Sequence, residues 1–129
     1  MSFANYLENA ILSFFLRNNA NAITAPATVY VAVFTADPGE DANTFEVVPG
    51  ANAYARKAAT WDAEVNGVTQ NAAEVRFDNM PGVTVTHFGV LDAITAGNAL
   101  YVGTVTPNEV VGAGDNLVFP PGALTITND

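Results

Sequence analysis

His87 is the only histidine of this 129-residue chain, which has no cysteine and carries serine only at positions 2 and 13. A histidine that acts as a general base needs a nucleophile or a carboxylate within hydrogen-bonding distance. A histidine-based metal site needs further ligands of the same kind. The chain also lacks the G-x-S-x-G segment that exposes a nucleophilic serine. We therefore expect His87 to be a hydrogen-bonded structural residue, and we expect no catalytic residue, no cofactor and no metal.

Two groups of carboxylates are further candidates for a metal site or a catalytic site. The segment DPGEDANTFE contains four acids that could bind Ca²⁺, namely Asp37, Glu40, Asp41 and Glu46. Their spacing does not match the D-x-[DN]-x-[DN]-G pattern, so a solvated turn is favoured. Asp62 and Glu64 would point to one side of a strand, like the two acids of a glycosidase. Exposed acids on strands are common, and we expect no catalysis there either. The GAGD segment at 112–115 lacks the Gly-Lys and the helix of a phosphate-binding loop, and it predicts a hairpin turn.

Arg56 and Lys57 are two of only four basic residues and stand next to each other. Neighbouring residues of a strand point to opposite faces, so the pair would be split between two surfaces. A guanidinium group is suited to two-pronged pairing with a carboxylate. Arg56 therefore pairs with a carboxylate across a subunit interface, pairs within its own chain, or is solvated. Trp61 is expected in the core or in an interface.

These residues must be positioned by one N-terminal helix and a set of strands. The length predicts a single domain, 1–129, with a helix over about 2–17 and a β-sandwich over about 26–129. Phe3, Leu7, Ile11, Phe14 and Phe15 follow the spacing of one helical stripe. Ser2 would cap the first turn. The helix packs either on its own sheet or on a neighbouring subunit.

Short segments rich in Val, Thr, Phe and Tyr follow the helix, separated by Gly, Pro, Asn and Asp. The predicted strands are 28–35, 54–61, 73–78, 83–91, 99–105, 108–111, 116–119 and 123–128. Eight strands after one helix predict a mainly β fold, an antiparallel β-sandwich of jelly-roll-like form. Strand 29–34 is apolar on both faces. One face would meet the opposite sheet, and the other needs the N-terminal helix or another subunit.

Charge and composition exclude several kinds of partner. Thirteen acids against four bases give a net charge of -9, which disfavours binding to nucleic acid or to an anionic membrane. The apolar runs are too short to span a bilayer, and the N-terminus does not resemble a secretory signal. Half of the residues are apolar and only 13% are charged. Such a composition favours self-association.

Five segments, in this order and spacing, resemble a family of small tailed-bacteriophage virion proteins labelled phage tail fibre proteins. They are NYLENAILSFFL, APATVYVAVFTADPG, YARKA, VTHFGVLDA and VVGAGDNLVFPPGALTITND. The resemblance covers nearly the whole chain, although Lys57 stands where many members have Gln. It implies a non-enzymatic structural protein of the virion, made in the host cytoplasm, with phage capsid or tail proteins as partners.

The chain has no coiled-coil, collagen-like or β-helical shaft, so a long fibre is not expected. We therefore expect an outer capsid cement or decoration protein that forms a trimer or dimer. The alternatives are a tail or tail-fibre component, and a receptor- or carbohydrate-binding module that uses Trp61, Tyr54, Tyr101 and the 37–46 loop. The residues expected to supply apolar interface or core are Phe3, Leu7, Ile11, Phe14, Tyr30 and Phe34, with Arg56 as a polar contact between subunits.

Overall fold

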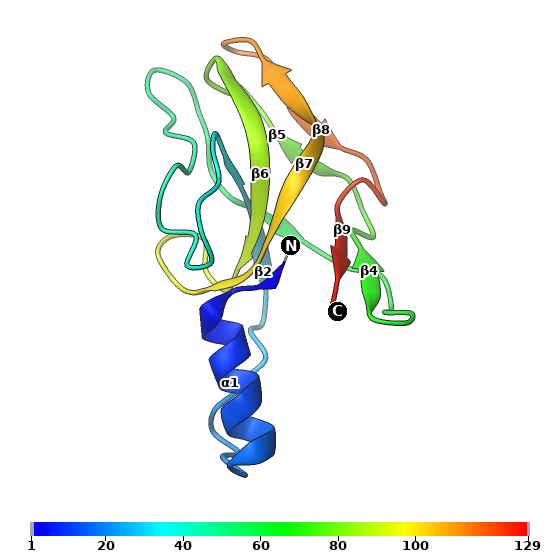
Figure 1. Ribbon diagram of the computed structural model, residues 1–129. Helices are drawn as coiled ribbons and strands as arrows, with labels where there is room; N and C mark the ends of the chain where they lie inside the picture. Colours follow the sequence, from blue (N-terminus) through cyan, green and yellow to red (C-terminus); the bar gives the residue numbers. More distant parts are fainter. Residues whose placement is uncertain (1, 129) are drawn as a thin grey trace.

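The computed structural model describes residues 2–128 and contains one helix and nine strands within that range (Figure 1). The helix is α1 (Asn5–Leu16). The strands are β1 (Ser2–Phe3), β2 (Val29–Phe34), β3 (Lys57–Ala59), β4 (Val68–Gln70), β5 (Val75–Phe77), β6 (Val83–Leu91), β7 (Ala99–Val111), β8 (Leu117–Phe119) and β9 (Thr125–Thr127).

The strands form one large sheet and two short ribbons. The large sheet has the order β1-β7-β6-β2-β3, and the ribbons are β4-β9 and β5-β8. Every pair in them is antiparallel. The prediction of a mainly β, antiparallel fold with one N-terminal helix is confirmed. The strand order differs from the two four-stranded sheets of a jelly roll, because the second layer consists of short ribbons.

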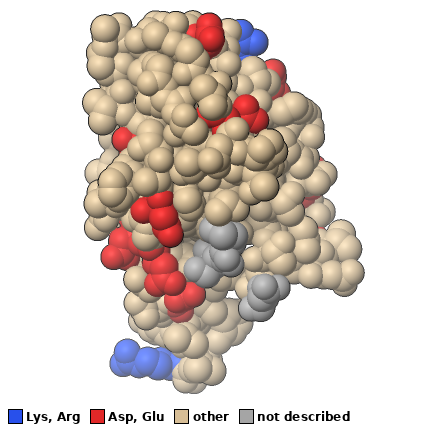
Figure 2. All heavy atoms as spheres, turned by 45° about the horizontal axis from the view of Figure 1, so that its top comes forward, with Lys and Arg blue, Asp and Glu red and all other residues tan. Residues whose placement is uncertain are grey.

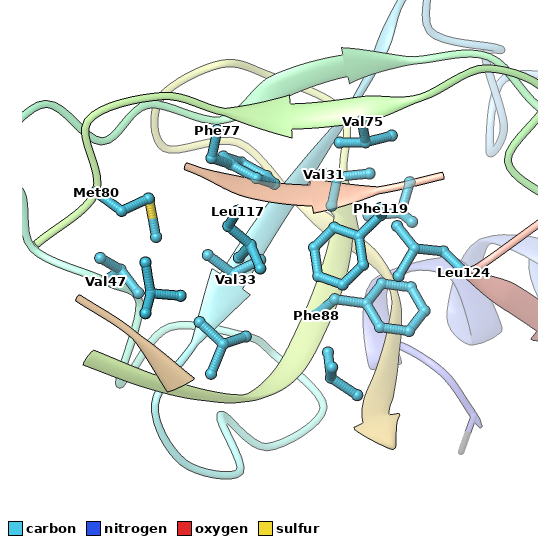
Figure 3. Close-up of a cluster of buried hydrophobic side chains, with 14 of the residues drawn as sticks. Val31, Val33, Val47, Val75, Phe77, Met80, Phe88, Leu117, Phe119 and Leu124 are labelled. Carbon is cyan, nitrogen blue, oxygen red and sulfur yellow. The ribbon is translucent and has the colours of Figure 1, made fainter. Parts of the chain in front are cut away.

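The main core lies between the large sheet and the β5-β8 ribbon (Figure 3). Phe77 and Phe119 of the ribbon face Val31 and Val33 of β2 and Phe88 of β6, and all five are almost fully buried. The rings of Phe77 and Phe119 meet edge to face, with their centroids 6.4 Å apart. In β2, β5 and β8, alternate residues supply this core, as the period of two requires.

A smaller cluster covers the other face of β2. Ala32 and Phe34 have no exposed surface, and they pack with Ala4, Ala42, Leu91, Ala99 and Val102. The residue that precedes α1 and the loop after β2 therefore cover this face within the same chain. Phe34 belongs to the core of the chain and reaches no outer surface.

A β-bulge explains why the pattern of β6 is hard to read from the sequence. Pairing with β7 shifts between Val85, opposite Glu109, and His87, opposite Thr104. The shift lets Val85 and Phe88, three positions apart, both enter the main core. Pro107, which has no N–H to donate, lies in the shifted part of β7. The predicted strands 99–105 and 108–111 are consequently one strand.

Several predicted boundaries were wrong. The helix begins at Asn5 with Ala4 in the N-cap position and no side-chain cap, because Ser2 pairs with Val102 in β1. Strand β4 was missed. It belongs to a hairpin whose turn, Asn66-Gly67, has positive φ at both residues, as a type I′ hairpin turn requires.

Candidate interaction surface

The α1 helix extends away from the sheets rather than lying on them (Figure 1). Only Ala10 of its twelve residues is buried. Leu7, Ile11 and Phe14 are half-buried, and the segment 18–28 returns alongside the helix. A helix of this length is marginal in water unless tertiary contacts support it. The contacts within residues 2–128 cover only one side of α1.

The other side of α1 exposes large apolar side chains. Leu12 is 55% exposed, Phe15 67% and Leu16 75%. They lie in the last two turns, and Arg17 follows as the exposed C-cap residue. Because exposed groups of this kind mark contact sites for other chains, this surface is the strongest candidate for function. We call it the helix surface.

A second apolar surface lies on the loops beside the large sheet. A groove of about 510 Å³ is bounded by the segment after β2 and the loop between β6 and β7. Its apolar lining is formed by Val47, Val48, Pro49, Ala55, Ile94 and Ala96. Val48 is 75% exposed and Ile94 52%. We call this surface the apolar groove.

Arg56 fixes the floor of the apolar groove from within the chain. Its Nε and Nη2 donate to the two carboxylate oxygens of Glu46 at 3.0 and 2.8 Å. Its Nη1 donates to the carbonyl oxygens of Ala93 and Ala96 at 3.0 and 2.7 Å. The Arg56 side chain is only 9% exposed. Of the predicted alternatives for Arg56, the structure therefore has the intrachain pair.

Tyr54 completes this cluster. Its hydroxyl donates to Glu46 at 2.7 Å and accepts from the backbone N–H of Val33 at 3.2 Å. Burial, followed by the negative charge of Glu46, raises the pKa of Tyr54 well above its ordinary value. The hydrogen bond to Glu46 raises the pKa of Arg56, which stays charged. The cluster thus connects β2 and both walls of the apolar groove.

The other residues singled out from the sequence are not assembled into a reactive site. Nδ1 of His87 lies 2.8 Å from Oγ1 of Thr86, its neighbour in the chain. Asp37 accepts from the N–H of Gly39, and Asp41 accepts from the side chain of Asn5. Within residues 2–128, no three histidine, aspartate or glutamate side chains come close enough to hold a metal ion.

The residues considered for sugar binding do not form a platform. Tyr101 is 4% exposed and belongs to the main core. Tyr54 stacks on Phe77 with its hydroxyl engaged. Trp61 is half-buried beside a separate depression of about 610 Å³ near the start of β2. Asp62, considered as one of two glycosidase acids, accepts from the Gln70 side chain instead.

Most of the predicted interface residues are buried or half-buried and pack within their own chain. Phe3 lies in β1, and its ring meets that of Tyr101. Tyr30 is half-buried in β2. The sequence reasoning missed Leu12, Leu16, Val48 and Ile94. For the helix, the signal was the presence of apolar residues all round its second half, which is unusual for a helix with one side in water.

Charge is unevenly distributed over the surface. Figure 2 shows one group of acidic side chains at the lower left of the view and others scattered towards the top, with basic side chains at the top and at the bottom. None of the helical structure in residues 2–128 has the length and apolar content of a membrane span.

This combination defines a small, mainly β protein module with a projecting helix that exposes large apolar side chains in its last two turns. The chain belongs to the family described as Podophage GP4 fiber I protein gp80, whose model matches residues 2–127. It is thus a phage fibre-like structural protein of the virion, as the sequence resemblance predicted. No curated protein matches the sequence.

Proposed function

We propose that this protein is a non-enzymatic structural subunit of the phage fibre, which self-associates and joins its neighbours through the helix surface. The family supports a fibre component rather than the outer capsid decoration expected from the sequence. The observation that carries the proposal is that Leu12, Phe15 and Leu16 are more than half exposed on a helix that leaves the sandwich. In this proposal, Leu7, Ile11 and Phe14 hold the helix in place.

The absence of enzymatic activity is part of the same proposal. The side chains best suited to acid–base chemistry, Glu46 and His87, are engaged in hydrogen bonds within the chain. Glu46 binds Arg56 and Tyr54, and His87 binds Thr86. Exposed apolar groups on a helix stabilise association because they are removed from water in the contact. Such association involves no covalent chemistry.

Virions that carry variant chains provide the test. We expect the double substitution Leu12→Asp, Phe15→Asp to abolish incorporation into particles, measured by quantitative mass spectrometry of purified virions. Val110→Asp is the matched control, because Val110 is 81% exposed on β7 and belongs to neither surface. A fibre component is expected at a few to tens of copies per particle. A count in the hundreds would instead indicate shell decoration, and normal incorporation of the double variant would refute the role of the helix.

A further inference from the structure

We infer that the helix surface of one copy docks into the apolar groove of the next copy, so that the chains associate head to tail. This inference rests on the proposed function, and it names both sides of the contact. The occupant of the groove is a second copy of this chain. Three features of the molecule support it: two separate apolar surfaces, their complementary charge and the direction of α1.

The two surfaces lie at different places on one chain. The last two turns of α1 extend beyond the body of the sandwich, so this end of the helix does not cover the groove of its own chain (Figure 1). A contact between two copies of the helix surface would leave both grooves open. A head-to-tail contact instead covers one helix and one groove for every pair of neighbours.

The chemistry of the two surfaces is complementary. Leu12, Phe15 and Leu16 offer apolar side chains, and Arg17 adds a positive charge that forms no ion pair within residues 2–128. The groove offers Val48 and Ile94.

One acidic side chain that forms no ion pair in the described part of the chain, Asp41, lies beside the groove. Glu46 and Arg56 neutralise each other at the groove, whereas Asp41 lines the adjoining hollow. In the inferred contact, Arg17 of one copy pairs with Asp41 of the next, and this pairing offsets some of the repulsion between chains of net charge -9.

The exposed area suits the central part of such an interface. Five side chains more than half exposed, Leu12, Phe15, Leu16, Val48 and Ile94, offer roughly 400 Å² of apolar surface. A stable specific interface buries about 1,600 Å² in total, with its apolar part at the centre and a polar rim around it. A head-to-tail contact closes into a ring or continues as a filament, according to the rotation between copies.

The test uses two single variants and their mixture. Leu16→Asp damages only the helix surface, and Val48→Asp damages only the groove; both positions are 75% exposed, so neither change disturbs the core. By sedimentation velocity, we expect the unmodified chain to form a multimer and each variant alone to be a monomer. An equimolar mixture is expected to form a dimer and no larger species, since it contains one intact helix surface and one intact groove. Val110→Asp is expected to keep the mass of the unmodified multimer.

Each other result overturns the inference. If either single variant retains the multimer, its surface is not part of the contact. If the mixture stays monomeric, the two surfaces do not pair with each other. An unmodified chain that remains monomeric at its solubility limit also overturns the head-to-tail contact. Incorporation into virions, measured separately, still decides whether the chain is a fibre subunit.

Discussion

Replacing Arg56 by methionine tests how the apolar groove is held in shape. The substitution keeps an unbranched apolar stem and removes four hydrogen bonds, two to Glu46 and two to the carbonyl oxygens of Ala93 and Ala96. The Glu46 carboxylate then loses both hydrogen bonds from Arg56 and keeps the one from the Tyr54 hydroxyl. The loop between β6 and β7 loses its attachment to the segment that precedes β3.

The expected cost follows from the burial of the pair. Breaking a fully buried ion pair by removing one partner costs about 3–5 kcal/mol. The Glu46 side chain is 27% exposed, so water recovers part of its solvation. We therefore expect a loss of about 2–3 kcal/mol in the free energy of unfolding, which for a domain of this size lowers Tm by roughly 6–12 °C.

Thermal and urea unfolding followed by circular dichroism measure this loss. Arg76→Met is the matched control, because Arg76 pairs with Asp78 while both side chains are about half exposed. Water screens an exposed pair so strongly that it adds little to stability, and this variant is expected to melt close to the unmodified chain. The double substitution Arg56→Met, Glu46→Gln should cost less than the sum of its two single substitutions. Equal Tm values for Arg56→Met and Arg76→Met, or strict additivity in that cycle, would refute the reasoning.

Three further predictions concern the interior. Asn71, fully buried, donates to the carbonyl oxygens of Ala73 and Pro120 and accepts from the N–H of Leu124. Asn71→Ala leaves these groups unpaired and should cost about 2–4 kcal/mol in urea unfolding; a loss below about 1 kcal/mol would show that water replaces the amide. At Gly103, an added Cβ would lie 2.6 Å from a ring carbon of buried Phe88. Gly103→Ala should therefore cost about 1–3 kcal/mol, whereas Gly82→Ala, with no atom nearer than 3.5 Å, should be nearly neutral, and equal losses would contradict this account. The raised pKa of Tyr54 means that the folded chain holds the phenol proton more tightly than the unfolded chain does. The contribution of Tyr54 to the free energy of unfolding is therefore fully present below about pH 10, the pKa of an ordinary tyrosine, and is lost as the pH rises above it. Tyr54→Phe should flatten that alkaline decline in denaturant titrations, and an unchanged decline would rule out Tyr54 as its source.

The strands were predictable where local pattern and burial agree. Strand β2 was expected because six consecutive apolar residues precede an Asp-Pro-Gly turn, and β5 was expected because Val75 and Phe77 alternate with polar neighbours. The bulge in β6 was not predictable, since it depends on pairing with a distant part of β7. For the same reason, Ser2 was taken as a helix cap although its backbone pairs with Val102.

The candidate surface was predictable only in part. The apolar stripe on residues 3–15 correctly indicated a helix, and the lack of reactive groups favoured association over catalysis. Which side of that helix meets its own chain depends on where the segment 18–28 returns, and no local pattern encodes that path. The apolar groove brings Val48 and Ile94 together from segments far apart in the sequence.

The sequence by itself determined the mainly antiparallel β character, the N-terminal helix and the acidic charge, because these depend on composition and on periods of a few residues. Tertiary structure alone decided that Phe34 is enclosed within its own chain, that Arg56 pairs with Glu46, and that Leu12, Phe15 and Leu16 are left exposed. These outcomes depend on contacts between residues far apart along the chain, and the burial of a side chain is set by everything that surrounds it.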